Sequence, residues 1–158
     1  MTVRAWRIVK SKRAATAFLG EAAKRTGGRW NSPGTPMVYV AGSTSLAMLE
    51  MLVHLQAREL LTRYALFEIS FDEALIKPID RKGLPRNWRK SPSPSVLQEV
   101  GDEWVARLES AVLKVPSAVV PTEWNYLLNP LHPEFGRIAI GPKKAVRFDS
   151  RLVRTTGR

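Results

Sequence analysis

The sequence reads Gly27-Gly28-Arg29-Trp30-Asn31-Ser32-Pro33-Gly34 and then continues through Tyr39 into an apolar segment that contains Glu50. This stretch places one arginine in a tight glycine-rich turn and one carboxylate on a helix face that we expect to be buried. Both placements are unfavourable for a simple scaffold, because an isolated charge in a low dielectric needs a partner. The pair therefore predicts a functional site.

The elements around this turn follow from local composition. Residues 14–25 are typical of a helix, which the glycines at 27–28 would end. Residues 37–41 predict a short strand. Residues 43–45 offer three candidate N-caps for a helix that extends to about Leu60. A first strand is expected at residues 3–9.

The second half predicts short strands around one more helix. Residues 72–95 are rich in proline and charge, which indicates an irregular excursion, and residues 96–110 predict a helix weakened at Gly101. Residues 126–130 predict the entry to a turn. The remaining strands are expected at residues 64–71, 111–115, 118–120, 138–140 and 145–148. This mixture, without a regular strand–helix–strand order, predicts an α+β fold with short mixed or antiparallel strands and flanking helices.

Size and composition predict one domain over residues 1–158, with an unstructured tail at 155–158. The chain has no cysteine, which excludes disulfides and thiol catalysis and fits a reducing compartment. It has two histidines, and no spacing of theirs suggests a metal site. No apolar leader or membrane-length apolar run occurs, so we expect a cytoplasmic protein without membrane contact.

The formal net charge is +11, from 25 Lys and Arg against 14 Asp and Glu. Such an excess favours anionic partners, which include nucleotides, nucleic acids and acidic proteins, or else forms a solvated surface without a specific partner. The basic residues are dense at 81–90 and again from Lys143 to Arg158.

Several polar residues are candidates for chemistry. Glu50 lies among apolar helix neighbours, so we favour a carboxylate that points into a cleft over a helix-edge pair with His54. Arg29 suits bidentate contact with phosphate or carboxylate, although alone it could be a surface arginine. Tyr39 could stack on a flat heterocycle or lie in the core.

The segment at residues 116–133 adds possible hydrogen-bonding groups: Ser117, Glu123, Asn125 and Asn129. Ser117 lacks a nucleophile-elbow motif, so a catalytic triad is not expected. The chain also lacks a Walker-type or dinucleotide-binding fingerprint, which argues against phosphoryl transfer and a Rossmann cofactor site.

Together these segments resemble the RES family, the toxin half of RES–Xre toxin–antitoxin pairs. The resemblance covers nearly the whole chain and rests on four motifs in order. They lie at residues 27–34, 37–41, 46–50 and 115–133, the last containing Val115-Pro116-Ser117-Ala118-Val119-Val120-Pro121.

The resemblance implies a fold similar to ADP-ribosyltransferase toxins and an enzyme that cleaves the nicotinamide–ribose bond of NAD. NAD would be the substrate, with no cofactor and no metal. The ADP-ribose acceptor would be water, phosphate or a protein side chain. An Xre-type antitoxin would be the partner, and direct nucleic-acid binding is not implied.

The resemblance also implies which residues form the site. Glu50 and Arg29 would be catalytic, with Glu50 stabilising a cationic ribosyl group. Arg29 would bind the diphosphate and Tyr39 would stack on nicotinamide. Ser117 would bind ribose or the carboxamide, and Asn125 would also bind NAD. Residues 72–95 would carry no site.

Two other interpretations remain open. A nucleic-acid-binding or RNA-cleaving toxin would use the basic run and Trp88 to contact phosphates and stack a base. A non-catalytic module would use its basic face to bind an acidic protein, with Glu50 as a structural acid.

Overall fold

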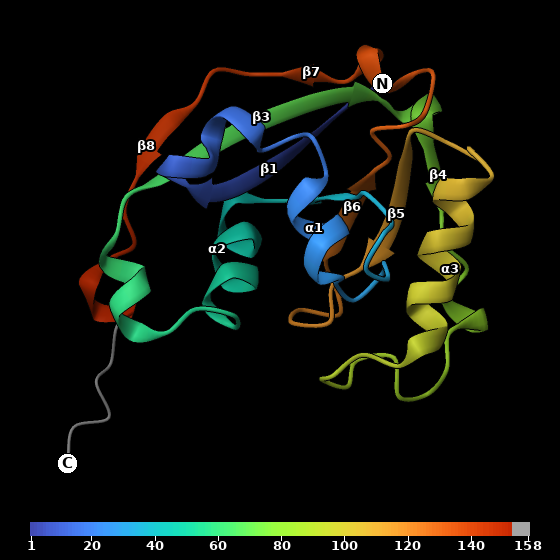
Figure 1. The fold of residues 1–158 in the computed structure, drawn as a ribbon, viewed down its shortest axis with the longest axis horizontal. Helices are drawn as coiled ribbons and strands as arrows, with labels where there is room; N and C mark the ends of the chain where they lie inside the picture. Colours follow the sequence, from blue (N-terminus) through green and yellow to red (C-terminus); the bar gives the residue numbers. More distant parts are fainter. Residues whose placement is uncertain (153–158) are drawn as a thin grey trace.

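The computed structural model describes residues 1–152. The tail expected at 155–158 lies outside this range. Eight strands form one curved sheet in the order β4-β5-β6-β2-β1-β3-β7, and β8 also pairs with β3 (Figure 1). The strands are β1 (Thr2–Lys10), β2 (Val38–Ala41), β3 (Tyr64–Asp72), β4 (Ile76–Pro78), β5 (Val112–Pro116), β6 (Trp124–Leu128), β7 (Ala139–Ile140) and β8 (Lys144–Val146).

All these strand pairs are antiparallel except β4 with β5. The helices are α1 (Glu21–Thr26), α2 (Thr44–Leu52) and α3 (Ser95–Ala106). Short 3-10 segments occur at Ser11–Thr16, Ala57–Leu61, Glu73–Leu75, Arg81–Gly83, Phe135–Arg137 and Ser150–Leu152. The α+β prediction is confirmed.

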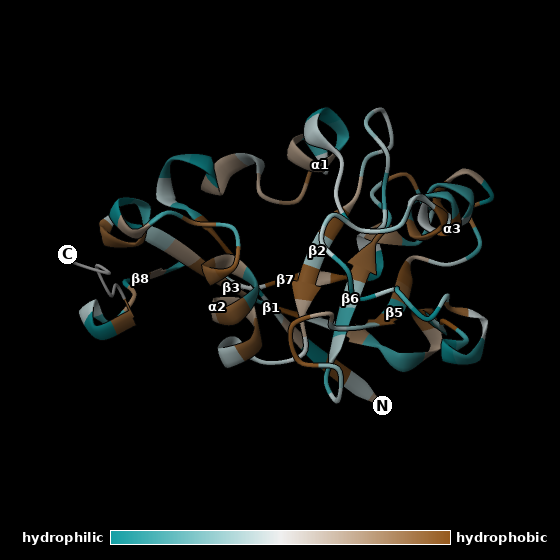
Figure 2. Ribbon diagram, turned by 90° about the horizontal axis from the view of Figure 1, so that it is seen from below, coloured by the Kyte–Doolittle hydropathy of each residue, from teal (hydrophilic) through white to brown (hydrophobic). Residues whose placement is uncertain are grey.

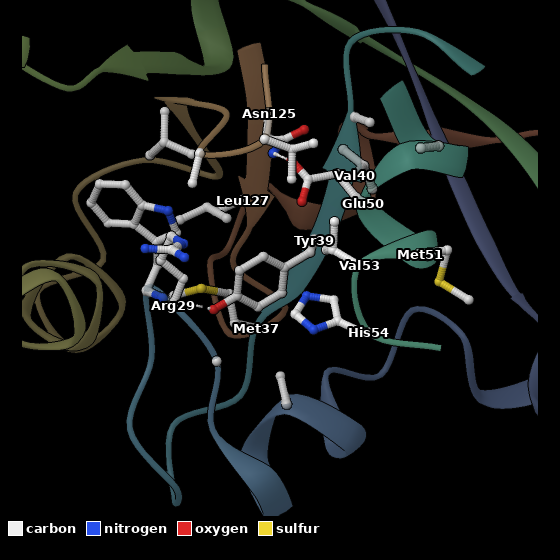
Figure 3. Close-up of a pocket in the computed structure, with 18 of the residues that line it drawn as sticks. Arg29, Met37, Tyr39, Val40, Glu50, Met51, Val53, His54, Asn125 and Leu127 are labelled. Atoms are coloured by element: carbon white, nitrogen blue, oxygen red, sulfur yellow. Dashed lines mark hydrogen bonds between the residues drawn. The ribbon is translucent and has the colours of Figure 1, made fainter. Parts of the chain in front are cut away.

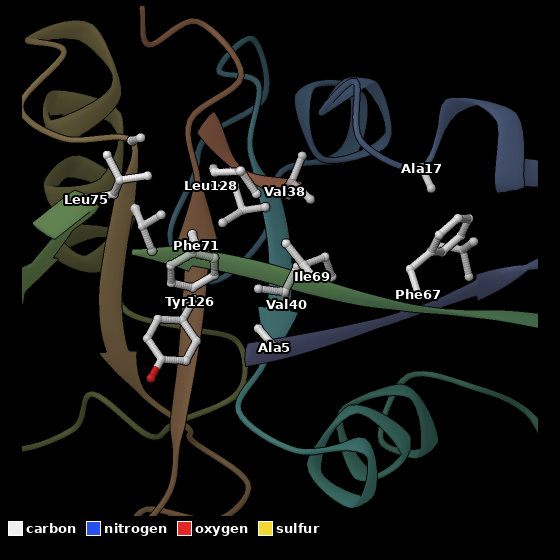
Figure 4. Packing of buried hydrophobic residues seen from close by; sticks show 14 of the residues in the cluster. Ala5, Ala17, Val38, Val40, Phe67, Ile69, Phe71, Leu75, Tyr126 and Leu128 are labelled. Carbon is white, nitrogen blue, oxygen red and sulfur yellow. The ribbon is translucent and has the colours of Figure 1, made fainter. Parts of the chain in front are cut away.

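The core lies on both faces of the central strands. Tyr126 and Leu128 of β6 pack with Val38 and Val40 of β2 and with residues of β3 (Figure 4). On the opposite face, Leu127 joins residues of α3 and β5 in a second cluster. Hydrophobic segments accordingly concentrate on the central strands, and many outer turns are hydrophilic (Figure 2). This packing fixes the centre of the sheet, on which the site is built.

Two predicted helices are shorter than expected. The helix predicted at 14–25 is divided, because Gly20 adopts a φ of 74° and its backbone lies against Met37. Helix α2 ends at Leu52 instead of about Leu60, and a separate 3-10 segment follows. The apolar composition around Glu50 does not bury α2 on every side, since Leu49 is 40% exposed and the C-cap residue Val53 is 58% exposed.

Four predictions in the second half differ from the structure. Gly101 does not interrupt α3, and it lets the helix pack closely on Trp30. Residues 126–130 were expected to enter a turn, yet Tyr126 lies in β6, which pairs with strands on both sides. The strand expected at 118–120 is a loop, and the excursion at 72–95 contains β4 and two 3-10 segments. The other predicted strands are present, with ends shifted by at most two residues.

No helix within residues 1–152 combines the length and apolar character that a membrane crossing requires.

Candidate active site

A cavity of about 900 Å³ opens beside β2 and β6. Its walls come from β1, α2, the turn at residues 27–30 and the loops at 89–93 and 118–119. Arg29, Tyr39, Glu50 and Asn125 all line it, and Figure 3 shows Glu50 pointing toward Asn125 with the Tyr39 ring nearby. The volume is in the range of small-molecule sites.

Helix α2 directs Glu50 into this cavity. The helix begins at the Ser43 cap, whose Oγ accepts a 3.0 Å hydrogen bond from the Leu46 N–H. In the last turn of the helix, Glu50 Oε1 accepts hydrogen bonds of 2.7 Å from Ser117 Oγ and 2.7 Å from Asn125 Nδ2. Within residues 1–152, Glu50 Oε2 accepts no hydrogen bond. The carboxylate is therefore held by one oxygen, and the other is left for a ligand.

Ser117 lies behind Glu50 and does not line the cavity. The residue is fully buried, and its Oγ accepts hydrogen bonds from the Val119 and Val120 N–H groups. The predicted direct contact of Ser117 with NAD therefore has no support in the geometry. The hydroxyl instead joins the loop after β5 to the carboxylate on α2.

Arg29 is held by the excursion that was expected to carry no site. Its Nη1 donates 2.9 Å hydrogen bonds to the carbonyl oxygens of Trp88 and Lys90. Arg89, Ser91 and Ser93 of the same excursion line the cavity, so the excursion forms part of the wall of the candidate site. Burial lowers the pKa of Arg29, while the charge of Glu50 opposes this shift.

Arg29 and Glu50 line the same cavity without forming an ion pair in the described part of the chain. Both charges can therefore act on a ligand. Their opposite signs suit a molecule that carries anionic and cationic groups at different ends.

The Tyr39 hydroxyl is tied to the turn that carries Arg29. It donates a 2.6 Å hydrogen bond to Asn31 Oδ1 and accepts a 3.1 Å bond from the Trp30 N–H. Burial raises the pKa of Tyr39. Gly28 permits this contact, because a Cβ at that position would lie 2.7 Å from the Tyr39 hydroxyl oxygen. The hydroxyl therefore makes hydrogen bonds within the protein, and the ring can contact a ligand.

The sequence analysis missed Arg7. This β1 residue lines the cavity and donates 2.8 Å hydrogen bonds to the carbonyls of Ala17 and Tyr39. Burial lowers the pKa of Arg7 to about 10, and no carboxylate pairs with it within residues 1–152. One feature of the sequence could have indicated Arg7: it is a charged residue between the apolar residues Trp6 and Ile8 of a predicted strand.

Two other candidate ligand-binding residues lie outside the cavity. Asn129 is buried and bonds the Val105 carbonyl and the Leu131 N–H. Glu123 accepts from Ser43 Oγ at 3.5 Å. His54 does line the cavity, with no hydrogen bond to Glu50 among the described residues. No group of three or more His, Asp or Glu side chains in residues 1–152 could hold a metal ion.

The basic excursion is folded onto its neighbours. The Arg81 guanidinium lies 5.8 Å from the Trp88 ring centre and 5.6 Å from that of Trp124, and it donates to the Pro121 carbonyl. Arg81 therefore lies beside the Trp88 indole, on which the nucleic-acid interpretation placed a stacked base.

The family is settled by comparison with known proteins. A model described as the RES domain matches residues 4–149. The chain belongs to the RES family. This result confirms the resemblance inferred from the four motifs.

Its relatives include proteins named as toxins. Toxin Res of Photorhabdus laumondii is 43% identical over 151 residues, which cover 94% of this chain and 96% of that protein. The Prs ADP-ribosylating toxin of Sphingobium sp. is 38% identical over 160 residues, covering 98% and 99% of the two chains.

A solved structure shares the fold of this RES protein. A chain of the M. tuberculosis MbcT–MbcA toxin–antitoxin complex aligns with a TM-score of 0.75 at 22% identity. The alignment covers 93% of this chain and 85% of the other.

Proposed function

We propose that this RES protein is the toxin of a toxin–antitoxin pair and that it cleaves the nicotinamide–ribose bond of NAD. The observation that carries the proposal is the Glu50 carboxylate, which Ser117 and Asn125 hold at a cavity shared with Arg29 and Tyr39. The names of the relatives, which include an ADP-ribosylating toxin, support the same chemistry.

The reaction suits a fixed carboxylate. Nicotinamide leaves with the electron pair of the bond to ribose C1′, and positive charge develops on the sugar. Glu50 stabilises this charge without reorganising, because its Oε1 is already bonded by two donors. The acceptor's oxygen or nitrogen atom then bonds to C1′, and a proton that it carries passes to solvent. Water, phosphate and a protein side chain are all acceptors of this kind.

The other residues bind different parts of the substrate. Arg29 and Arg7 bind the diphosphate, because both residues line the cavity and neither has an ion-pair partner among the described residues. Tyr39 offers its ring to nicotinamide. Ser117 and Asn125 orient Glu50, and Asn125 also faces the cavity. NAD is the substrate, and no resident cofactor is needed for this step.

The test is incubation of the purified protein with NAD, with and without phosphate, with nicotinamide and the second product identified. Glu50→Gln keeps the shape and one oxygen acceptor but removes the charge, so we expect turnover to fall by about 10²–10³. Glu99→Gln, at an exposed position of α3, is the matched control and should behave as wild type. Folded wild-type protein that releases no nicotinamide with any acceptor would refute the proposal.

We also propose a protein antitoxin as the partner, of the Xre type, acting in the cytoplasm where NAD is available. Support comes from the family and from the toxin–antitoxin complex that shares the fold. Co-expression with an Xre-type antitoxin from the same genome should restore growth and yield a co-purifying complex. Growth arrest that persists despite equal expression of that protein would contradict this partner.

A further inference from the structure

Helix α3 contacts the Arg29 turn from outside the cavity. Gln98 Nε2 donates hydrogen bonds of 3.0 Å to the Gly28 carbonyl and 3.2 Å to the Asn31 carbonyl. Asp102 Oδ1 accepts a 2.9 Å bond from the Ser32 N–H. Neither Gln98 nor Asp102 lines the cavity.

The same helix face also makes a close backbone contact. A Cβ on Gly101 would lie 1.7 Å from the Trp30 carbonyl oxygen, so α3 and the turn are directly packed. Residues 98, 101 and 102 are spaced by three and four positions, which places them on one face of a helix. One face of α3 therefore makes three kinds of contact with the turn. Gln98 donates hydrogen bonds, Asp102 accepts one, and Gly101 packs against the backbone.

These contacts constrain the backbone on both sides of Arg29. Gly28 and Asn31 also form a bridge with each other, through a 2.9 Å bond from the Gly28 N–H to the Asn31 carbonyl. Gln98 is therefore the only side chain within residues 1–152 that bonds both carbonyls at the base of this bridge. Asn31 in turn holds the Tyr39 hydroxyl, so a shift of the turn would move two cavity residues at once.

We propose that Gln98 is a positioning residue, which fixes Arg29 and Tyr39 for NAD binding by donating to both ends of the Gly28–Asn31 bridge. This inference rests on the proposed function and extends it to a helix that contacts no substrate. Because the diphosphate at Arg29 and the nicotinamide ring at Tyr39 are both contacted already in the bound substrate, misplacing these two residues weakens substrate and transition-state binding alike. The signature is therefore a raised KM with a largely unchanged kcat.

The test compares two variants of Gln98. Gln98→Met removes both donors at similar length, and Gln98→Glu keeps the shape of glutamine but sets a carboxylate against two carbonyl oxygens. Both new residues are good helix formers, so α3 should persist. We expect KM for NAD to rise about tenfold in Gln98→Met, because part of the free energy of the two lost hydrogen bonds appears in NAD binding, and further in Gln98→Glu. A role in packing alone predicts the reverse order.

Amide hydrogen exchange of the segment at residues 28–32, measured without NAD, gives a second readout. It should become faster in both variants and stay unchanged in Glu99→Met, a control at the exposed neighbouring position. Unchanged exchange, or faster exchange with unchanged KM, would overturn the inference. Failure of the proposed function is read separately, as absence of nicotinamide release by the wild type, and the NAD-positioning role would then fall with it.

Discussion

The Ser117 hydroxyl donates to Glu50 Oε1 at 2.7 Å while it accepts from two backbone N–H groups, those of Val119 and Val120. A hydroxyl has a single proton, and two donors already approach this oxygen, so the proton is directed at the carboxylate. The loop after β5 thereby sets the orientation of an acid that lies on α2.

Ser117→Ala tests this arrangement. The change removes a donor from Glu50 and leaves two partly buried N–H groups without their acceptor, which costs about 1–3 kcal/mol of unfolding free energy. Turnover of NAD should fall about tenfold or more, as expected for a misoriented electrostatic stabiliser. KM should change by less than about twofold, which is much less than the loss of a substrate contact would cause, because Ser117 does not line the cavity.

Steady-state kinetics and urea unfolding measure these effects, and Ser45→Ala, at an exposed position of α2, is the control. A large rise in KM with normal kcat would show instead that the hydroxyl contacts the substrate.

Tyr39→Phe separates the ring from the hydroxyl. The ring remains for stacking, whereas the buried Trp30 N–H and Asn31 Oδ1 lose their partner, so stability should fall by about 1–3 kcal/mol. NAD turnover between pH 6 and 9 should keep the wild-type pH profile, since burial raises the pKa of this phenol and it transfers no proton there. A lost ionisation in the variant's pH–rate profile would contradict a stacking role.

The raised pKa of Tyr39 also predicts how stability depends on alkaline pH. Above the ordinary value of 10.0 the unfolded chain releases the phenolic proton while the folded protein retains it. The folded state then binds more protons, so unfolding free energy falls as pH rises above this value. Urea unfolding at several pH values up to 11 should show a smaller fall in Tyr39→Phe than in the wild type.

Arg7→Met tests the second guanidinium of the cavity. The variant loses the charge proposed to bind diphosphate, so KM for NAD should rise about tenfold to a hundredfold. Initial rates at several NAD concentrations measure this change. An unchanged KM in Arg7→Met would remove Arg7 from the NAD site.

Gly101→Ala tests the packing of α3 on the turn. The new methyl group would overlap the Trp30 carbonyl, so the variant should lose about 1–3 kcal/mol of stability despite the higher helix propensity of alanine. Gly136→Ala is the control, since a Cβ there meets no atom within 4 Å. Thermal unfolding that is unchanged in Gly101→Ala would contradict the close contact.

Local patterns predicted the residues that line the cavity better than the contacts that hold them. Glycines beside Arg29 and an acid among apolar residues are visible along the chain, and the cavity does contain both charges. The partners of Arg29, in contrast, are the backbone carbonyls of Trp88 and Lys90, and a carbonyl is present at every position. Gln98 acts on the turn from 70 residues away, a separation that no local pattern reports.

Tertiary packing also explains the errors in the fold. Tyr126 and Leu128 pack on one face of β6 and Leu127 packs on the other. A strand buried on both faces shows no alternation of polar and apolar residues, so its pattern resembled a turn entry before proline. Gly20 interrupts a helical composition because of its contact with Met37, which only the folded chain contains.

The insertion of β6 between β2 and β5 has a consequence for the time at which activity emerges during translation. Asn125 and Ser117 leave the ribosome 75 and 67 residues after Glu50, and both are needed to hold its carboxylate. A nascent chain that ends before β6 lacks Asn125 and the strand that joins β2 to β5. The producing cell therefore meets a competent site only after β6 has left the ribosome.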